Sequence, residues 1–258
     1  MPGTIVSEKP FTDATIQASR VITLDQEPVA GNLLVLVFTA GPSATVDTPS
    51  GWTKRTEVNE SCDFIFFDRD APASFGTTIT VTQTGSSRAC AYFCEVGGMQ
   101  PASFDKSATN TVDNGGTGTT AALTQADEFA IGAVSDLAVS GGTGNNYSAW
   151  SNGYVEKADL SPATGTNDPQ LGVAVNFLTS AAATSTTPTG GTDSGAICTY
   201  KATLLPVVAR RAASTWPGAG PFPRSRTRRR PGDTTLVEPA ASVTQRPAPF
   251  ISQYGSYF

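Results

Sequence analysis

The sequence of 258 residues contains no histidine. Histidine is the commonest general base in enzymes and a frequent zinc ligand, so its absence removes the usual partner of a serine or cysteine nucleophile and the usual zinc site. Glycosidases built on a pair of carboxylates can work without it. The absence therefore favours a non-enzymatic protein without metal or cofactor, and leaves carboxylate chemistry as the alternative.

Charged residues are also scarce, at 15% of the chain, against roughly 25% in average soluble domains. The polar surface must therefore come from threonine, serine, asparagine and glycine. Helical bundles carry Glu, Lys and Arg on their surfaces, whereas sheets carry Thr and Ser well. The composition favours an all-β protein.

Long apolar runs are absent, since the longest covers only residues 33–38 and is too short to span a bilayer. The chain also opens without the basic start and apolar core of a signal peptide. We therefore expect synthesis in a cytoplasm, no membrane insertion, and exit from the cell, if any, by a route other than ordinary secretion.

Four cysteines occur, and none of them forms a CxxC pair. Cys90 and Cys94 share one face of an expected strand but lie too far apart along it to bond with each other. Buried free thiols are the first interpretation. A disulfide across the sheet from Cys90 to Cys198 is the alternative.

The few charges divide the chain near residue 205. Residues 206–258 contain eight arginines against two carboxylates, a net charge of +6, whereas residues 1–205 carry a net charge of −11. Eight of the 18 prolines also fall in this last segment. Both changes in composition predict a globular domain over residues 1–205 and an extended arm over residues 206–258.

The body consists of apolar runs separated by turns rich in Gly and Pro, which is typical of β-sheets. Residues 32–39 and 63–67 have the nearly continuous apolar pattern of strands buried on both faces, and residues 77–84 alternate with period two. Further strands are expected at 88–96, 129–134, 172–178 and 196–205. Because no amphipathic helix is evident, we predict a two-layer β-sandwich of jelly-roll-like type.

A weak internal repeat indicates that the sandwich is pseudo-duplicated. Residues 33–40 resemble residues 129–136, and Trp52 has a counterpart in Trp150. The strongest match aligns Ala-Cys-Ala-Tyr at 89–92 with Ile-Cys-Thr-Tyr at 197–200. Common β patterning is the alternative source of this similarity.

The arm has the composition of a docking peptide. Its prolines favour an extended path, and it cannot bury a core of its own. Its arginine cluster, residues 224–230, suits an acidic protein surface, including that of a neighbouring copy; a solvated linker and then nucleic acid follow as alternatives. The residues expected to dock are Trp216, Phe222, Arg224, Arg226, Arg228, Arg229, Arg230, Phe250, Tyr254 and Phe258.

The body offers two further candidates for a site. Asp68 and Asp70 could form a catalytic carboxylate pair. A polar turn with a local ion pair to Arg69 explains these carboxylates more simply. Separately, flat aromatic rings suit sugar rings, and the candidates for glycan binding are Trp52, Tyr147 and Trp150. Their alternative role is to anchor turns against the core.

The order of motifs within residues 1–205 resembles that of a known kind of module. A buried strand at 32–37 is followed by Pro-Ser-Gly-Trp-Thr at 49–53 and by an aromatic strand with a basic residue at 64–69. An alanine-rich strand at 89–97 completes the series. This order resembles the β-sandwich modules in virion proteins of tailed bacteriophages, especially those of actinobacteria.

The resemblance implies a virion structural protein, with capsid decoration preferred over a minor tail role. Expected partners are the major capsid or tail proteins and further copies of the chain, on the virion surface after synthesis in the host cytoplasm. No catalytic residue is implied for such a module. A glycan-binding module for attachment to host surfaces is the other function considered.

Overall fold

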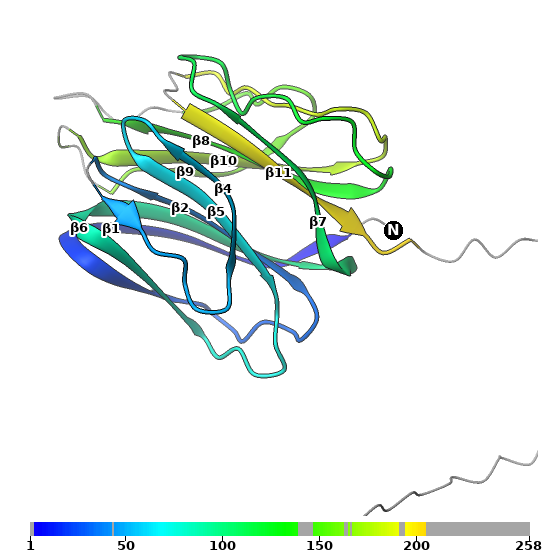
Figure 1. Ribbon diagram of the computed structural model, residues 1–258, viewed down its shortest axis with the longest axis horizontal. Helices are drawn as coiled ribbons and strands as arrows, with labels where there is room; N and C mark the ends of the chain where they lie inside the picture. The colour runs from blue at the N-terminus through cyan, green and yellow to red at the C-terminus, as the bar shows by residue number, and fades with distance from the viewer. Residues whose placement is uncertain are drawn as a thin grey trace, which may run out of the picture. The chain divides into compact units, whose positions relative to one another are not determined.

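The computed structural model describes residues 3–42, 44–138, 147–162, 165, 167–190 and 194–204. These residues form eleven strands and no helix. The strands make two sheets that pack face to face (Figure 1). The predicted all-β sandwich is therefore confirmed. All described residues belong to the first of the two units into which the chain separates, Met1–Val207, and the predicted arm lies outside them.

The first half of the chain forms one sheet, drawn from blue to teal in Figure 1. Its strands lie in the order β1 (Thr4–Thr23), β6 (Thr78–Gly97), β2 (Leu33–Ala40), β5 (Asp63–Asp70) and β4 (Thr53–Asn59). The short strand β3 (Thr45–Val46) pairs with β6. Every residue of β2 is buried, because both faces of this sheet are covered.

The second half forms the other sheet, drawn from green to yellow. Its strands lie in the order β7 (Met99–Asn110), β11 (Ser194–Ala202), β8 (Glu128–Leu137), β10 (Pro169–Leu178) and β9 (Val155–Leu160). The chain passes from the first sheet to the second at Gly98, whose φ of +78° favours glycine.

The two sheets have the same strand order. When β1, β2, β4, β5 and β6 are matched with β7, β8, β9, β10 and β11 in turn, each strand keeps equivalent neighbours. Single extra residues interrupt the pairing at equivalent places: Val6 in β1, Asp105 in β7, Arg55 in β4 and Lys157 in β9. Since bulges are specific features of a strand pair, this agreement makes the pseudo-duplication a property of the fold.

The bulges also fix which residues correspond. When Leu33 is matched with Phe129, the bulges and the registers of both sheets agree. This is the correspondence that the sequence repeat predicted. Leu33 pairs with Val96, and Phe129 pairs with Tyr200. The counterpart of Cys198 is therefore Cys94. The predicted alignment with Cys90 is out of register, because similar residue types recur along strands with the same pattern of burial.

Three apolar clusters stabilise this arrangement. The largest lies between the sheets, where inward side chains of β2, β5 and β6 meet those of β8, β10 and β11. A second covers the outer face of the first sheet, where the far ends of β1 and β6 contribute Ile22, Ile79 and Val81. A third covers the outer face of the second sheet and includes Tyr147 and Trp150. Both outer faces are thus apolar and covered.

All four cysteines are buried and free. Burial raises the pKa of every one of these thiols, because the thiolate is poorly solvated inside the sandwich. The first interpretation of the cysteines as small buried side chains is confirmed, and the alternative disulfide between Cys90 and Cys198 is not formed.

Candidate functional site

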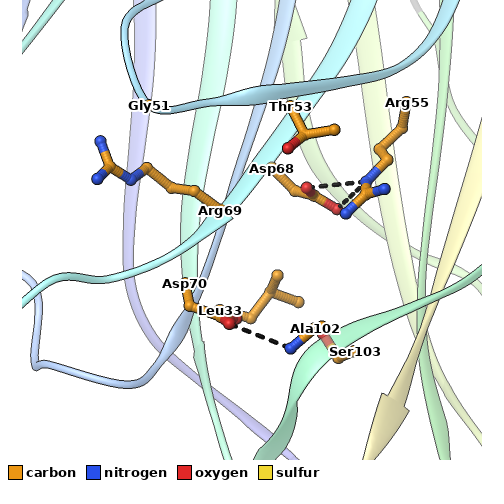
Figure 2. A pocket seen from close by; sticks show the side chains of 9 residues that line it. All are labelled: Leu33, Gly51, Thr53, Arg55, Asp68, Arg69, Asp70, Ala102 and Ser103. Atoms are coloured by element: carbon orange, nitrogen blue, oxygen red, sulfur yellow. Dashed lines mark hydrogen bonds and ion pairs between the residues drawn. The ribbon is translucent and has the colours of Figure 1, made fainter.

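A polar pocket opens at the edge of the sandwich where β4 and β5 lie opposite β7 (Figure 2). Its volume is ≈ 270 Å³. We refer to it as the β4–β5–β7 pocket. Its lining consists of Leu33, Gly51, Thr53, Arg55, Asp68, Arg69, Asp70, Ala102 and Ser103.

Strand β5 sends its last three residues to opposite faces of the sheet. Phe64 and Phe66 belong to the core between the sheets, so the two-residue period places Asp68 and Asp70 on that same face. Arg69 points to the other face, and Figure 2 shows it extending away from Asp68. The predicted polar turn is wrong, because these residues complete the strand.

Arg55, the extra residue of the β4 bulge, reaches across to Asp68. Its Nε lies 2.9 and 2.8 Å from the two carboxylate oxygens, and its guanidinium carbon lies 4.4 Å from the centroid of the Phe104 ring. Burial raises the pKa of Asp68, and the hydrogen bond and charge of Arg55 oppose that rise. Asp68 therefore pairs with Arg55 of the adjacent strand, and the predicted local ion pair with Arg69 is wrong.

Arg69 packs against aromatic rings on the opposite face. Its guanidinium carbon lies 5.2 Å from the ring centroid of Phe75 and 6.0 Å from that of Trp52. Gly51 has a φ of +78°, and a Cβ added there would lie 2.9 Å from Nη1 of Arg69. The glycine of the Pro-Ser-Gly-Trp turn is therefore required both for its backbone conformation and for the space that Arg69 fills.

A second hollow of ≈ 250 Å³ lies on this face and shares Arg69 with the pocket. Trp52 and Phe75 line it, and their rings meet edge to face with centroids 6.2 Å apart. Arg69 therefore separates a polar pocket from a partly aromatic one.

Two residues of β7 complete the pocket. Ala102 has a left-handed φ of 50°, and its N–H donates to Oδ2 of Asp70 at 3.1 Å. Ser103 is 1% exposed, and its hydroxyl has no hydrogen-bond partner among the described residues. Burying a hydroxyl without a partner costs about 1–3 kcal/mol. Ser103 is therefore a polar group that a ligand in the pocket could satisfy.

The three predicted glycan-binding aromatics lie in the cores. Trp52 and Trp150 are each 8% exposed, and Tyr147 is 0% exposed. Trp52 packs in the cluster over the first sheet, and Tyr147 and Trp150 pack in the cluster over the second. Their positions match the anchoring role considered as the alternative, and sugar stacking on these rings stays a prediction.

The predicted docking residues of the arm, from Trp216 to Phe258, lie outside the described residues. Nothing in the fold tests them. For the β4–β5–β7 pocket, sequence reasoning named Asp68 and Asp70 as a possible carboxylate pair, preferred a turn there, and missed the contributions of Arg55, Ala102 and Ser103. The internal repeat is the signal that could have revealed these residues, because the equivalent positions of the second half carry different residue types.

The second half has a hollow at the equivalent place, with a volume of ≈ 350 Å³. We refer to it as the β9–β10–β1 hollow. Aligned bulges and registers equate five residues of the pocket with five residues of this hollow. The pairs are Thr53 with Val155, Arg55 with Lys157, Asp68 with Val175, Arg69 with Asn176, and Asp70 with Phe177.

Comparison with known proteins finds no matching family model, no matching curated protein and no matching solved structure. Over the residues that the structure describes, no three His, Cys, Asp or Glu side chains gather to hold a metal ion. That same part of the chain has no helix long and apolar enough to cross a membrane. The volume and the charged lining of the β4–β5–β7 pocket suit a small polar ligand.

Proposed function

We propose that this chain is a non-enzymatic structural protein of a bacteriophage particle, and specifically a capsid decoration protein. The sandwich projects from the particle, and the arm from about residue 206 anchors it to major capsid proteins or to neighbouring copies. The observation that carries the proposal is the division of the chain into an acidic sandwich with filled cores and a basic, aromatic-rich segment.

The sandwich fills its cores without the arm. The three apolar clusters of the described residues draw on side chains between Ile5 and Ala202. The last nine residues nevertheless contain five large apolar or aromatic side chains: Phe250, Ile251, Tyr254, Tyr257 and Phe258. Such side chains are a liability on a solvated tail, and they support docking into apolar pockets of a partner.

Charge supports the same arrangement. The arm carries +6 and the rest of the chain −11, so arms are attracted to the bodies of other copies as well as to other acidic surfaces. Arginine pairs with carboxylates through short, charge-assisted hydrogen bonds. Repetition over a particle makes many weak contacts effective together. Decoration is preferred over a minor tail role because one sandwich and one arm suffice for it.

The test is co-sedimentation with purified particles of the phage that encodes the chain, at low and high salt. Full-length protein should pellet with particles and be released by salt, because ionic contacts on a surface are screened. A variant with Arg224, Arg226, Arg228, Arg229 and Arg230 changed to Gln should stay in the supernatant at the same melting temperature.

A truncation to residues 1–205 should also stay in the supernatant, although its sandwich remains folded. Pelleting of the truncation as well as the full chain would contradict anchoring by the arm. Immunogold labelling of bound particles then separates the two locations, since a decoration protein labels the capsid and a minor tail protein labels the tail.

A further inference from the structure

The polar lining of the β4–β5–β7 pocket is not a requirement of the fold. The β9–β10–β1 hollow is formed by the equivalent strands of the second half, with the equivalent bulge and register. Its apolar residues Val155, Val175 and Phe177 take the places of Thr53, Asp68 and Asp70. A position that accepts an apolar residue in one half does not need a polar residue for packing in the other. Because Asp68 is explained by its ion pair with Arg55, the residues of the polar set that point to a ligand are Thr53 and Asp70.

The charges of the pocket indicate a ligand without net charge. Asp68 and Asp70 disfavour an anion, while Arg55 and Arg69 disfavour a cation. The pair of Arg55 with Asp68 is neutral as a unit. A neutral ligand that both donates and accepts hydrogen bonds can use all of these groups at once.

The hydrogen-bonding groups that remain available are of both kinds. Both hydrogen bonds from Arg55 to Asp68 use Nε, so its terminal nitrogens keep their N–H donors. Asp70 accepts from Ala102 through Oδ2 and retains its other oxygen. Ser103 adds a buried hydroxyl that has no partner among the described residues. Paired donors and acceptors around a small space suit the adjacent hydroxyls of a sugar ring.

We propose that the β4–β5–β7 pocket binds a neutral saccharide, with Asp70, Arg55 and Ser103 as hydrogen-bonding groups and Asp68 as the residue that positions Arg55. One sugar ring occupies the pocket. The site differs from the three aromatics predicted from the sequence, and it does not rest on the particle function proposed above.

The test uses the full-length protein and measures ligand binding alone. Neutral methyl glycosides of glucose, galactose, mannose, arabinose and N-acetylglucosamine, with their common disaccharides, are titrated by saturation-transfer NMR and calorimetry. Glucuronate and glucosamine serve as charged probes of similar size. We expect saturable binding of at least one neutral sugar and no tighter binding of the charged probes.

Three variants connect binding to the pocket. Asp70→Phe introduces the residue of the apolar counterpart at an exposed position and should abolish binding by filling the pocket. Ser103→Ala should weaken binding about tenfold, yet leave the melting temperature equal or higher, because it removes a buried hydroxyl without a partner. Asp113→Asn, an exposed carboxylate outside the pocket, is the matched control and should bind like the wild type.

The outcomes are distinct. Binding of a neutral sugar that Asp70→Phe abolishes and Asp113→Asn retains supports the proposal. Absence of saturable binding by every neutral sugar, preference for a charged probe, or wild-type binding by both pocket variants would overturn it. None of these results changes the sedimentation test of the arm, so the two proposals fail separately.

Discussion

The two halves of the sandwich share their strand order and bulges, but they use the equivalent basic residue differently. In the first half Arg55 pairs with Asp68, whose side chain is only 3% exposed. In the second half Lys157 of β9 pairs with Glu8 of strand β1 in the other sheet, at 2.6 Å and with side chains 24% and 31% exposed. Topology fixes where the bulge and its basic residue lie, whereas the residues around it are free to diverge. Information about function therefore lies in the differences between the halves.

A second difference concerns one buried carboxylate in each half. Glu95 accepts hydrogen bonds from the Ser7 hydroxyl, the Val29 N–H and the Asn32 side chain. Glu128, at the position that corresponds to Asn32, is also buried, and Thr199 and Asp105 lie beside its carboxylate. Burial, with the charge of Asp105 nearby, raises the pKa of Glu128 to about 7. The buried acid of the first half is thus held by three donors, whereas the buried acid of the second half lies beside another carboxylate.

The largest expected effect comes from removing the partner of Arg55. Asp68→Ala should lower the free energy of unfolding by about 3 kcal/mol, because it removes charge-assisted hydrogen bonds made by a carboxylate whose side chain is only 3% exposed. The equivalent change in the second half, Glu8→Ala, should cost less than about 1 kcal/mol, because that ion pair is partly exposed to water. Urea denaturation of both variants measures the difference. Equal losses would show that the two ion pairs do not differ as their exposure implies.

The next effect is a pH dependence that comes from Glu128. Its pKa in the folded state, about 7, lies above its ordinary value of 4.5. The unfolded chain therefore releases this proton first, and stability should fall as pH rises from 4.5 to about 7 and change little above that. We expect a loss of up to about 3 kcal/mol over this range.

Glu128→Gln isolates this contribution from other titrating groups. The variant should be more stable than the wild type at pH 8, and the difference between the two should shrink as the pH is lowered toward 4.5. Thermal denaturation of both proteins over this range gives the comparison. A constant difference across the range would mean that Glu128 is already ionised in the folded protein.

The smallest effect should come from exchanging counterparts at the rims of the two hollows. Thr53 and Val155 are both exposed, so Thr53→Val and Val155→Thr should each change stability by less than about 0.5 kcal/mol. Melting temperatures of the single and double variants suffice as the measurement. A large loss for Thr53→Val alone would indicate that the polar lining is needed by the fold, and would weaken the case for a ligand.

The sequence predicted the inner strands well and missed the edge strands. β2, β5, β8, β10 and β11 were expected because their apolar runs reflect burial on both faces. The edge strands β1, β4, β7 and β9 were not expected, because their polar and partly exposed residues lack a clear period. Strand β6 was expected as two strands but continues through residues 85–87 without a break.

The full candidate site could not be predicted from the sequence, because edge strands without a clear period contribute much of it. Its residues come from the end of β5, from the bulge of β4 and from the irregular start of β7, and only pairing between strands brings them together. Arg55 is 13 positions from Asp68, and no spacing rule connects them. The repeat contained the missing signal, because aligning the halves sets Asp68 and Asp70 against Val175 and Phe177.

The single passage between the sheets at Gly98 has a consequence for the origin of this chain. Each sheet is built from one continuous half, and the equivalent residues Thr39 and Ser135 contact each other through their hydroxyls at 2.9 Å, as residues beside a twofold axis do. The chain thus has the form of a symmetric dimer whose protomers have been joined. In a true homodimer every mutation appears at both edges. Fusion removes that constraint, so that one edge can become polar while the other stays apolar.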